Sequence, residues 1–197
     1  METVRSNELR AFFTYVVSVL EKFDISYMVV GGFAVIFYGA PRLTIDVDIV
    51  VDMQLQHVQT FVGAFPVPTY YASEEGIRDS LLRRYPFNVI EPSTGAKVDL
   101  VPLPSDLFSR FAFQRRQRMV YDEAGHAAMF ITAEDIILAK LLAYRETNSD
   151  KHLQDARGVL LMQWDELNWN RIQRAANGAN VAELLEPLVE AVRQELE

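Results

Sequence analysis

The sequence contains no cysteine, so disulfide bonds and metal sites with thiolate ligands are excluded. No uninterrupted apolar segment approaches the roughly 18 residues that a membrane-spanning helix requires. Residues 1–5 show neither the basic nor the apolar region of a signal peptide. We therefore expect a cytoplasmic protein that has no membrane partner.

Positive charge is also scarce, because 27 acidic residues outnumber 19 basic ones and the formal net charge is −8. This balance argues against broad, nonspecific nucleic-acid binding, which needs clustered cations to neutralise phosphates. One basic run still stands out, and it contains Arg110, Arg115, Arg116 and Arg118. Such a basic edge would suit an RNA end or a nucleoside triphosphate, whereas the alternative is an ordinary solvated helix face.

The chain has 197 residues, of which 50% are hydrophobic. This length and composition suit one or two small domains with a real core. Period-two and helical apolar patterns alternate along the chain, which predicts both strands and helices.

A pair of glycines follows the apolar segment from Ile25 to Val30 and precedes a second apolar segment, 33–38. This order predicts a strand, a glycine turn and a short helix. Gly31 and Gly32 permit positive φ angles and let a backbone N–H approach a phosphate, while a helix N-terminus adds partial positive charge. A plain tight turn would produce the same pair of glycines.

Two acidic residues stand two apart in the next strand-like segment. Successive side chains of a strand alternate between its faces, so Asp46 and Asp48 share one face. The aliphatic residues around them would face the core: Ile45, Val47, Ile49 and Val51. Two neighbouring carboxylates repel each other, and a hard divalent cation such as Mg²⁺ relieves that repulsion. The alternative is a solvated strand edge that carries two aspartates.

A third carboxylate occurs in the segment 97–101, which reads as a strand after the strand 87–91 and the turn 92–95. If this strand lies beside the one that carries Asp46 and Asp48, Asp99 shares their side of the sheet and completes a site for two metal ions. The alternative is an exposed polar position on an alternating strand.

These motifs resemble the signature of the DNA polymerase beta-like nucleotidyltransferase superfamily. The signature has a hydrophobic-Gly-Gly turn, a spacer, Asp-x-Asp between aliphatic residues, and a distal Asp on a later strand. The Arg-x-Thr-x-Asp-x-Asp run that starts at Arg42 resembles, more narrowly, the AbiEii-type minimal nucleotidyltransferases. The resemblance implies an α+β fold in which a small mixed sheet is flanked by helices and followed by a C-terminal helical region.

By this resemblance, Asp46, Asp48 and Asp99 would bind two Mg²⁺ ions, for which Mn²⁺ could substitute. Asp99 would also accept the proton of the attacking hydroxyl. Gly31 and Gly32 would hold the triphosphate.

Two further residues precede the first metal ligand and would contact the nucleotide. For Arg42 the alternative is a structural salt bridge, and for Thr44 it is an ordinary strand position. One departure from the superfamily pattern is Phe33, because many members have Ser after the two glycines. A hydroxyl contact to phosphate is therefore missing, which bears on nucleotide affinity rather than on the fold.

The C-terminal segment resembles the helical part of the same group. Thr132 with Asp135 forms a capping-box pattern, so we expect a helix to begin there. Lys140 on this helix would contact a phosphate, and Asp155 would orient Lys140 or the nucleotide. Alternatively, Lys140 extends past its apolar neighbours to solvent, and Asp155 pairs with Lys151 on an exposed helix face.

We expect a catalytic domain over residues 1–131 and a C-terminal helical region over 132–197 that packs on it and completes the active site. The N-terminal helix should begin after a Ser6 cap and bury an apolar stripe. That stripe contains Leu9, Phe12, Phe13, Val16, Leu20 and Phe23. Further helices are expected over 54–64, 74–84 and 105–118, and short strands over 119–131.

Other chemistry-bearing residues have ordinary explanations. The three histidines, His57, His126 and His152, show no metal-ligand spacing. Trp164 and Trp169 should anchor the last helices rather than stack on a base.

The leading functional hypothesis is a nucleotidyltransferase that moves a nucleoside monophosphate from an NTP, such as ATP, to a hydroxyl acceptor and releases pyrophosphate. By resemblance the acceptor would be a tRNA 3′ end and the protein the toxin of a pair with a cognate antitoxin. An aminoglycoside or a protein hydroxyl is the alternative acceptor. A second hypothesis is a catalytically silent module of the same fold that binds a nucleotide or a protein partner, and a third is a purely structural protein.

Overall fold

The computed structural model describes residues 2–40 and 46–197. The chain divides into two compact units. The first contains the described residues up to Phe33 and those from Asp46 to Phe130, and the second contains residues 34–40 and 131–197. The second unit thus takes in a short segment from the N-terminal half.

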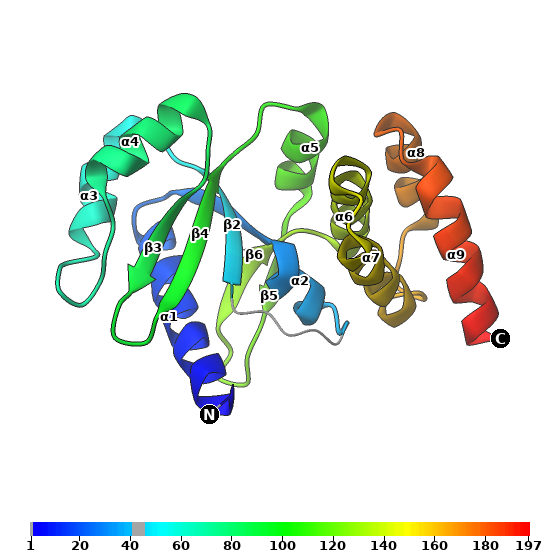
Figure 1. Cartoon of the computed structure of the whole chain (residues 1–197), viewed down its shortest axis with the longest axis horizontal. Coiled ribbons are helices and arrows are strands. Elements are labelled where there is room, and N and C mark those ends of the chain that lie inside the picture. Colours follow the sequence, from blue (N-terminus) through cyan, green and yellow to red (C-terminus); the bar gives the residue numbers. More distant parts are fainter. Residues whose placement is uncertain (1, 41–45) are drawn as a thin grey trace. The chain divides into compact units, whose positions relative to one another are not determined.

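The described strands of the first unit form a six-stranded sheet in the order β3-β4-β2-β1-β6-β5 (Figure 1). The neighbours β2 and β4 are parallel, as are β1 and β6, and the other neighbouring strands are antiparallel. The strands are β1 (Ser26–Val30), β2 (Asp46–Asp52), β3 (Phe87–Glu91), β4 (Ala96–Pro102), β5 (Gln117–Val120) and β6 (Ala127–Phe130). The predicted mixed sheet is confirmed.

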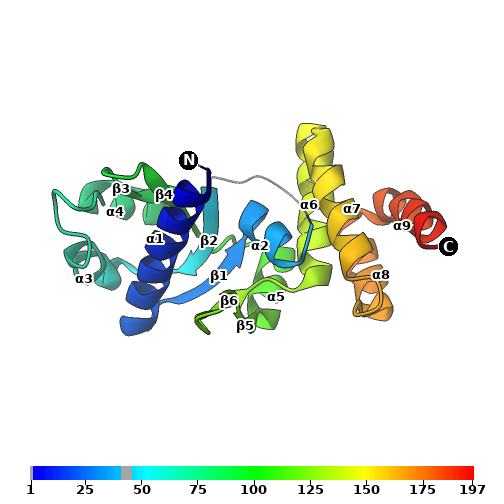
Figure 2. The same cartoon turned by 90° about the horizontal axis from the view of Figure 1, so that it is seen from below.

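Helix α1 (Glu2–Lys22) runs along one face of this sheet, against β1 and β4 (Figures 1 and 2). Most of its apolar stripe is core, as predicted, because Phe12, Phe13, Val16 and Leu20 are buried. The two end members, Leu9 and Phe23, are only half-buried. The predicted Ser6 cap is wrong, because the helix already begins at Glu2. Residues 2–5 contain no proline or glycine, so nothing in them stops the helix from extending upstream.

The remaining helices of the first unit connect the strands. They are the 3₁₀ helix η1 (Leu55–His57), α3 (Val58–Gly63), α4 (Glu74–Arg83) and α5 (Leu107–Arg115). The predicted helix over 105–118 is therefore too long, since α5 ends at Arg115 and β5 starts at Gln117. Pairing of β5 with β6 across the turn decides the conformation of residues 117–120.

The second unit is helical beyond residue 131. Its helices are α6 (Ala133–Thr147), α7 (Asp150–Met162), α8 (Trp169–Gly178) and α9 (Ala182–Leu196). Helices α6 and α7 pack on each other through buried aliphatic residues, among them Ile137, Leu141 and Val159. The segment 34–40 belongs to this unit, and within it the Tyr38 hydroxyl donates a 2.6 Å hydrogen bond to the Ile131 carbonyl.

Helix α2 (Gly31–Phe37) follows β1 directly. The predicted order of strand, glycine turn and short helix is thereby confirmed. None of the described helices has both the length and the apolar character of a membrane-spanning segment.

Candidate active site

The two strands that carry the predicted acidic residues lie side by side. In the parallel pair β2 and β4, Asp48 stands opposite Asp99 and Asp46 stands opposite Lys97. Residues two apart on a strand and residues opposite each other in a ladder share a face of the sheet. Asp46, Asp48 and Asp99, hereafter the acidic triad, therefore lie on one face, as the sequence predicted for neighbouring strands.

The opposite face of the same strands is the core. The residues that alternate with the acids are fully buried there: Val47, Ile49, Val98 and Leu100. The acids keep contact with solvent, because the side chains of Asp46 and Asp99 are 50% and 20% exposed. Burial of the aliphatic set fixes the register, since a slip of one residue would exchange the two faces.

Gly31 places the end of β1 against Asp48. Strand β1 pairs with β2 so that Val30 stands opposite Asp48, and Gly31 follows with a φ of +66°. A Cβ atom on Gly31 would overlap the Asp48 carboxylate. Glycine is therefore required at position 31 for a structural reason as well as for its predicted contact with phosphate. Only a residue without a side chain lets the backbone turn this close to Asp48.

The two residues after Gly31 are packing residues in this structure. Gly32 is buried in the first turn of α2. The ring of Phe33 packs against Phe13 and Phe130, with centroid distances of 4.8 and 6.3 Å. The position where many superfamily members have Ser is thus part of an aromatic cluster here.

A cation that the sequence analysis did not single out stands among the acids. The Lys97 Nζ lies 2.7 Å from Asp99 Oδ2 and 3.7 Å from Asp46 Oδ1. The hydrogen bond to Asp99 raises the pKa of Lys97, and the charges of the three acids add to this effect while partial burial opposes it. The sequence places Lys97 two residues before Asp99, which puts both on one face of a strand. Its contact with Asp46 could not be predicted, because it depends on β4 lying beside β2.

The acidic triad has the residue types and the register that a divalent cation requires. Carboxylate oxygens are its preferred ligands, and the Lys97 ammonium already bridges carboxylates from both strands as a positive charge. Within residues 2–40 and 46–197, however, no three or more acidic or histidine side chains are arranged in a group that could hold a metal ion. Metal binding by the triad therefore requires its side chains to rearrange.

The nucleotide-binding residues predicted between α2 and β2, Arg42 and Thr44, lie outside the described residues. Their contacts stay predictions.

In the second unit, Lys140 and Asp155 form a buried ion pair between α6 and α7. The Lys140 Nζ lies 2.8 Å from Asp155 Oδ2, and the two side chains are only 10% and 6% exposed. Lys140 therefore does not extend to solvent, and Asp155 pairs with Lys140. The ion pair fixes the position of the Lys140 ammonium. This contact is compatible with the role that the resemblance implies for Asp155, which is to orient Lys140.

The start of α6 is fixed by the predicted cap. The Thr132 hydroxyl accepts a hydrogen bond from the Asp135 backbone N–H at 3.3 Å and lies 3.0 Å from its carboxylate. Glu134 forms a buried ion pair with Arg171 of α8. These contacts set the helical position of Lys140, two turns further on.

Three of the four arginines of the basic run have side-chain partners in the first unit. Arg118 forms a 2.7 Å ion pair with Glu21, and the Arg116 guanidinium lies 4.1 Å from the centroid of the Phe113 ring. Arg115 lies over the Phe111 ring at 6.0 Å. These three arginines thus make local contacts, and Arg118 stands on strand β5 and not on the helix that the sequence predicted.

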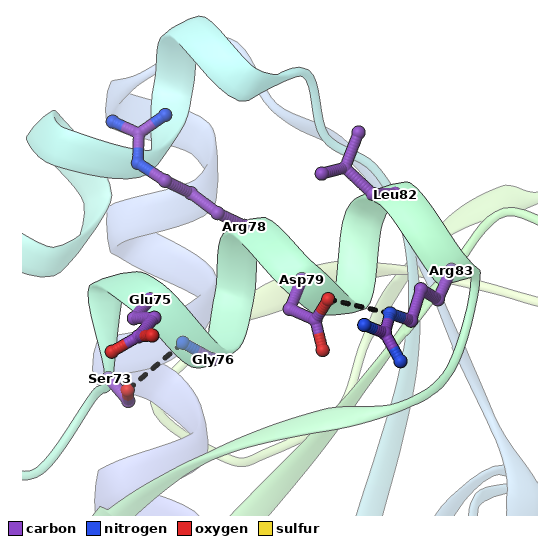
Figure 3. A pocket seen from close by; sticks show the side chains of 7 residues that line it. All are labelled: Ser73, Glu75, Gly76, Arg78, Asp79, Leu82 and Arg83. Atoms are coloured by element: carbon purple, nitrogen blue, oxygen red, sulfur yellow. Dashed lines mark hydrogen bonds and ion pairs between the residues drawn. The ribbon is translucent and has the colours of Figure 1, made fainter.

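An open pocket of about 630 Å³ lies along α4 and contains none of the predicted site residues (Figure 3). It is lined by Ser73, Glu75, Gly76, Arg78, Asp79, Leu82 and Arg83. Both arginines are neutralised by acids four residues earlier on the helix, Arg78 by Glu74 and Arg83 by Asp79, each at 2.8 Å. A pocket whose charges are already balanced gives no sign of a charged ligand.

The two tryptophans of the chain contact each other. Trp164 and Trp169 pack edge to face with ring centroids 4.6 Å apart at the start of α8. This contact agrees with the prediction that they anchor the last helices.

The sequence matches no family model and no curated protein. A solved structure, that of an antigenic nucleotidyltransferase-like protein from Paracoccidioides brasiliensis, superposes with a TM-score of 0.56 at 19% identity and covers 95% of this chain and 93% of its own. This chain has a nucleotidyltransferase fold. The fold class predicted from the sequence is confirmed.

Two other solved structures are similar to a lesser degree. The antibiotic-resistance factor ANT(2'')-Ia has a TM-score of 0.48 at 13% identity, with 100% of this chain and 95% of that chain covered. JHP933 from Helicobacter pylori also has a TM-score of 0.48 at 13% identity, with 96% and 91% covered.

Proposed function

We propose that the protein is a nucleotidyltransferase that depends on divalent cations and moves a nucleoside monophosphate from an NTP to a hydroxyl acceptor. The observation that carries the proposal is the register that sets Asp48 opposite Asp99, with Asp46 on the same face and Gly31 turning beside Asp48. Three carboxylates on one face repel one another, and on these two rungs of the ladder they face a single ammonium, that of Lys97. A divalent cation would relieve the repulsion further.

The acidic triad would hold two Mg²⁺ ions, or Mn²⁺ in their place. When bound, the ions supply Lewis-acid stabilisation of the attacking and leaving oxygens. The acceptor oxygen attacks the α-phosphorus, its proton passes to Asp99, and the bond to the bridging oxygen breaks so that pyrophosphate leaves with the electron pair. The protein would contribute by placing charged groups around the reacting phosphate and by holding the acceptor oxygen in line with the leaving oxygen.

The remaining predicted residues would bind the nucleotide. Gly31 and Gly32 would admit the triphosphate close to the backbone, and Arg42 and Thr44 would contact it from the segment before β2. Lys140 would contact a phosphate as a point charge whose position Asp155 holds.

The acceptor and the biological role rest on resemblance. Our leading proposal is that the protein is of the AbiEii type and modifies a tRNA 3′ end in the cytoplasm. A cognate antitoxin would oppose it. An aminoglycoside or a protein hydroxyl is the alternative acceptor.

The experiment is a transfer assay with each of the four α-³²P-labelled NTPs and Mg²⁺ against total tRNA, aminoglycosides and the protein itself. Asp48→Asn is the inactive control, and Asp79→Asn on α4 is the matched control for loss of one carboxylate. Label transfer that Asp48→Asn reduces at least 100-fold and Asp79→Asn leaves intact supports the proposal. Transfer that survives Asp48→Asn contradicts it.

The second candidate function is a catalytically silent module of the same fold. The observation that favours it is Phe33, whose ring takes part in aromatic packing where a phosphate-binding hydroxyl would otherwise stand. The same assay separates the two. Tight NTP binding by calorimetry without transfer to any acceptor supports the module, and a melting temperature that neither metal nor nucleotide raises supports a purely structural protein.

A further inference from the structure

Lys97 is the one side chain of opposite charge that the register of β2 and β4 places on the face of the acidic triad. Four charged side chains form two rungs of the parallel ladder there, Asp46 opposite Lys97 and Asp48 opposite Asp99. Three negative charges and one positive charge leave a net charge of −2 on these rungs. The ammonium is therefore a counter-charge to the acids of these two rungs.

The position of the Lys97 ammonium overlaps with the function proposed for the acids. It lies 2.7 Å from Asp99 Oδ2 and 3.7 Å from Asp46 Oδ1, so it joins carboxylates of the two strands. A divalent cation that binds the same acids uses the same negative charge, and the ammonium repels it. The ammonium also occupies one of the acceptor sites of Asp99 Oδ2.

We propose that Lys97 is a resident counter-cation of the acidic triad and that it competes with a divalent cation for the carboxylates of Asp99 and Asp46. This inference rests on the proposed function, because that function requires the divalent cation. Lys97 is a positioning residue: it holds the carboxylates of β2 and β4 together when metal is absent and yields them when metal binds.

The Lys97 side chain can move as this role requires. It is 36% exposed, and a lysine ammonium sits on a flexible four-carbon stem that can swing toward solvent. A unit positive charge about 5 Å from a divalent cation weakens binding of that cation by roughly tenfold in a water-like dielectric. Removal of the ammonium should therefore tighten metal binding by about this factor.

The test measures Mn²⁺ affinity without nucleotide, from the electron paramagnetic resonance signal of free Mn²⁺, on the full chain. Lys97→Met keeps the length and apolar stem of the side chain and removes its charge, whereas Lys97→Arg keeps the charge. Arg118→Met is the matched control. Arg118 also forms a 2.7 Å ion pair, and it stands on the edge strand β5, with β2, β1 and β6 between it and β4.

Lys97→Met should bind Mn²⁺ about tenfold more tightly than the parent, and Lys97→Arg and Arg118→Met should bind within twofold of it. In EDTA, Lys97→Met should melt at a lower temperature than the parent, and saturating Mn²⁺ should remove most of that difference. The melting curves also show whether each variant is folded.

An unchanged or weaker Mn²⁺ affinity in Lys97→Met overturns the inference, and so does an equal gain in Arg118→Met, which would reflect net charge alone. The proposed function survives that result if the parent's Mn²⁺ binding is lost in Asp48→Asn. If neither the parent nor Lys97→Met binds Mn²⁺, or if Asp48→Asn binds it as the parent does, the metal requirement of the proposed function fails and the inference fails with it.

Discussion

Replacement of Gly31 by alanine tests how closely the glycine turn and the acidic triad depend on each other. Gly31 has a φ of +66°, a region that costs a residue with a Cβ about 1–2 kcal/mol. The new Cβ would also lie 2.9 Å from the Asp48 Cβ and would overlap its carboxylate. The Asp48 Cβ is fixed by the backbone of β2, so no change of rotamer relieves the contact. A shift of the strand or the turn adds about 1–3 kcal/mol.

We therefore expect Gly31→Ala to lower the free energy of unfolding by about 2–5 kcal/mol. Gly95→Ala is a matched control, because Gly95 has a φ of +73° but nothing within 4 Å of its Cβ position. It should pay only the backbone cost of about 1–2 kcal/mol. Urea titrations followed by far-UV circular dichroism measure both values.

The same two variants should separate in function. Displacement of the Asp48 carboxylate should weaken Mn²⁺ binding of folded Gly31→Ala at least tenfold, whereas Gly95→Ala should bind as the parent does. Equal losses of stability in the two variants, together with equal Mn²⁺ affinities, would show that Gly31 does not make room for Asp48.

Three further predictions concern contacts outside the triad. Lys140→Met removes the ammonium of a buried ion pair and should lower the free energy of unfolding by about 3–5 kcal/mol, whereas the exposed Lys151→Met should change it by less than about 0.5 kcal/mol, both from urea titrations. Tyr38→Phe leaves a buried carbonyl without its hydroxyl donor and should cost about 1–2 kcal/mol in the same titration, so a loss below about 0.3 kcal/mol would contradict that reading. The hydrogen bond from His126 lowers the pKa of Asp122, so its stabilising effect is present above the ordinary pKa of about 4 and is lost as the pH falls through the lowered value. The difference in melting temperature between the parent and Asp122→Asn should accordingly shrink below pH 4, and a difference that grows there would show that the sign is wrong.

The period-two patterns around Asp46, Asp48 and Asp99 were sufficient to predict two strands and the face that each acid occupies. They could not establish that the strands are neighbours, because strand order depends on contacts between segments far apart in the sequence. Lys97 was missed for this reason. On an isolated strand it is an ordinary exposed lysine, and it becomes part of the triad's surroundings only when β4 pairs with β2.

Local signals at helix ends were of unequal value. Thr132 with Asp135 predicted the start of α6 correctly, since a capping box is a contact between residues three apart. Ser6 was wrong as a cap because the residues before it also sustain a helix. The end of α5 at Arg115 and the membership of segment 34–40 in the second unit depend on tertiary pairing, which periodicity does not encode.

The proposed site requires that Asp48 and Asp99, 51 positions apart in the chain and opposite each other in the sheet, serve one divalent cation. A double-mutant cycle on Mn²⁺ binding tests it most directly, with Asp48→Asn, Asp99→Asn and the double variant measured beside the parent. If the two carboxylates share one cation, each single variant weakens binding at least tenfold and the double variant loses far less than the product of the two factors. Strictly multiplicative losses, or a single variant that binds Mn²⁺ as the parent does, would contradict a shared site.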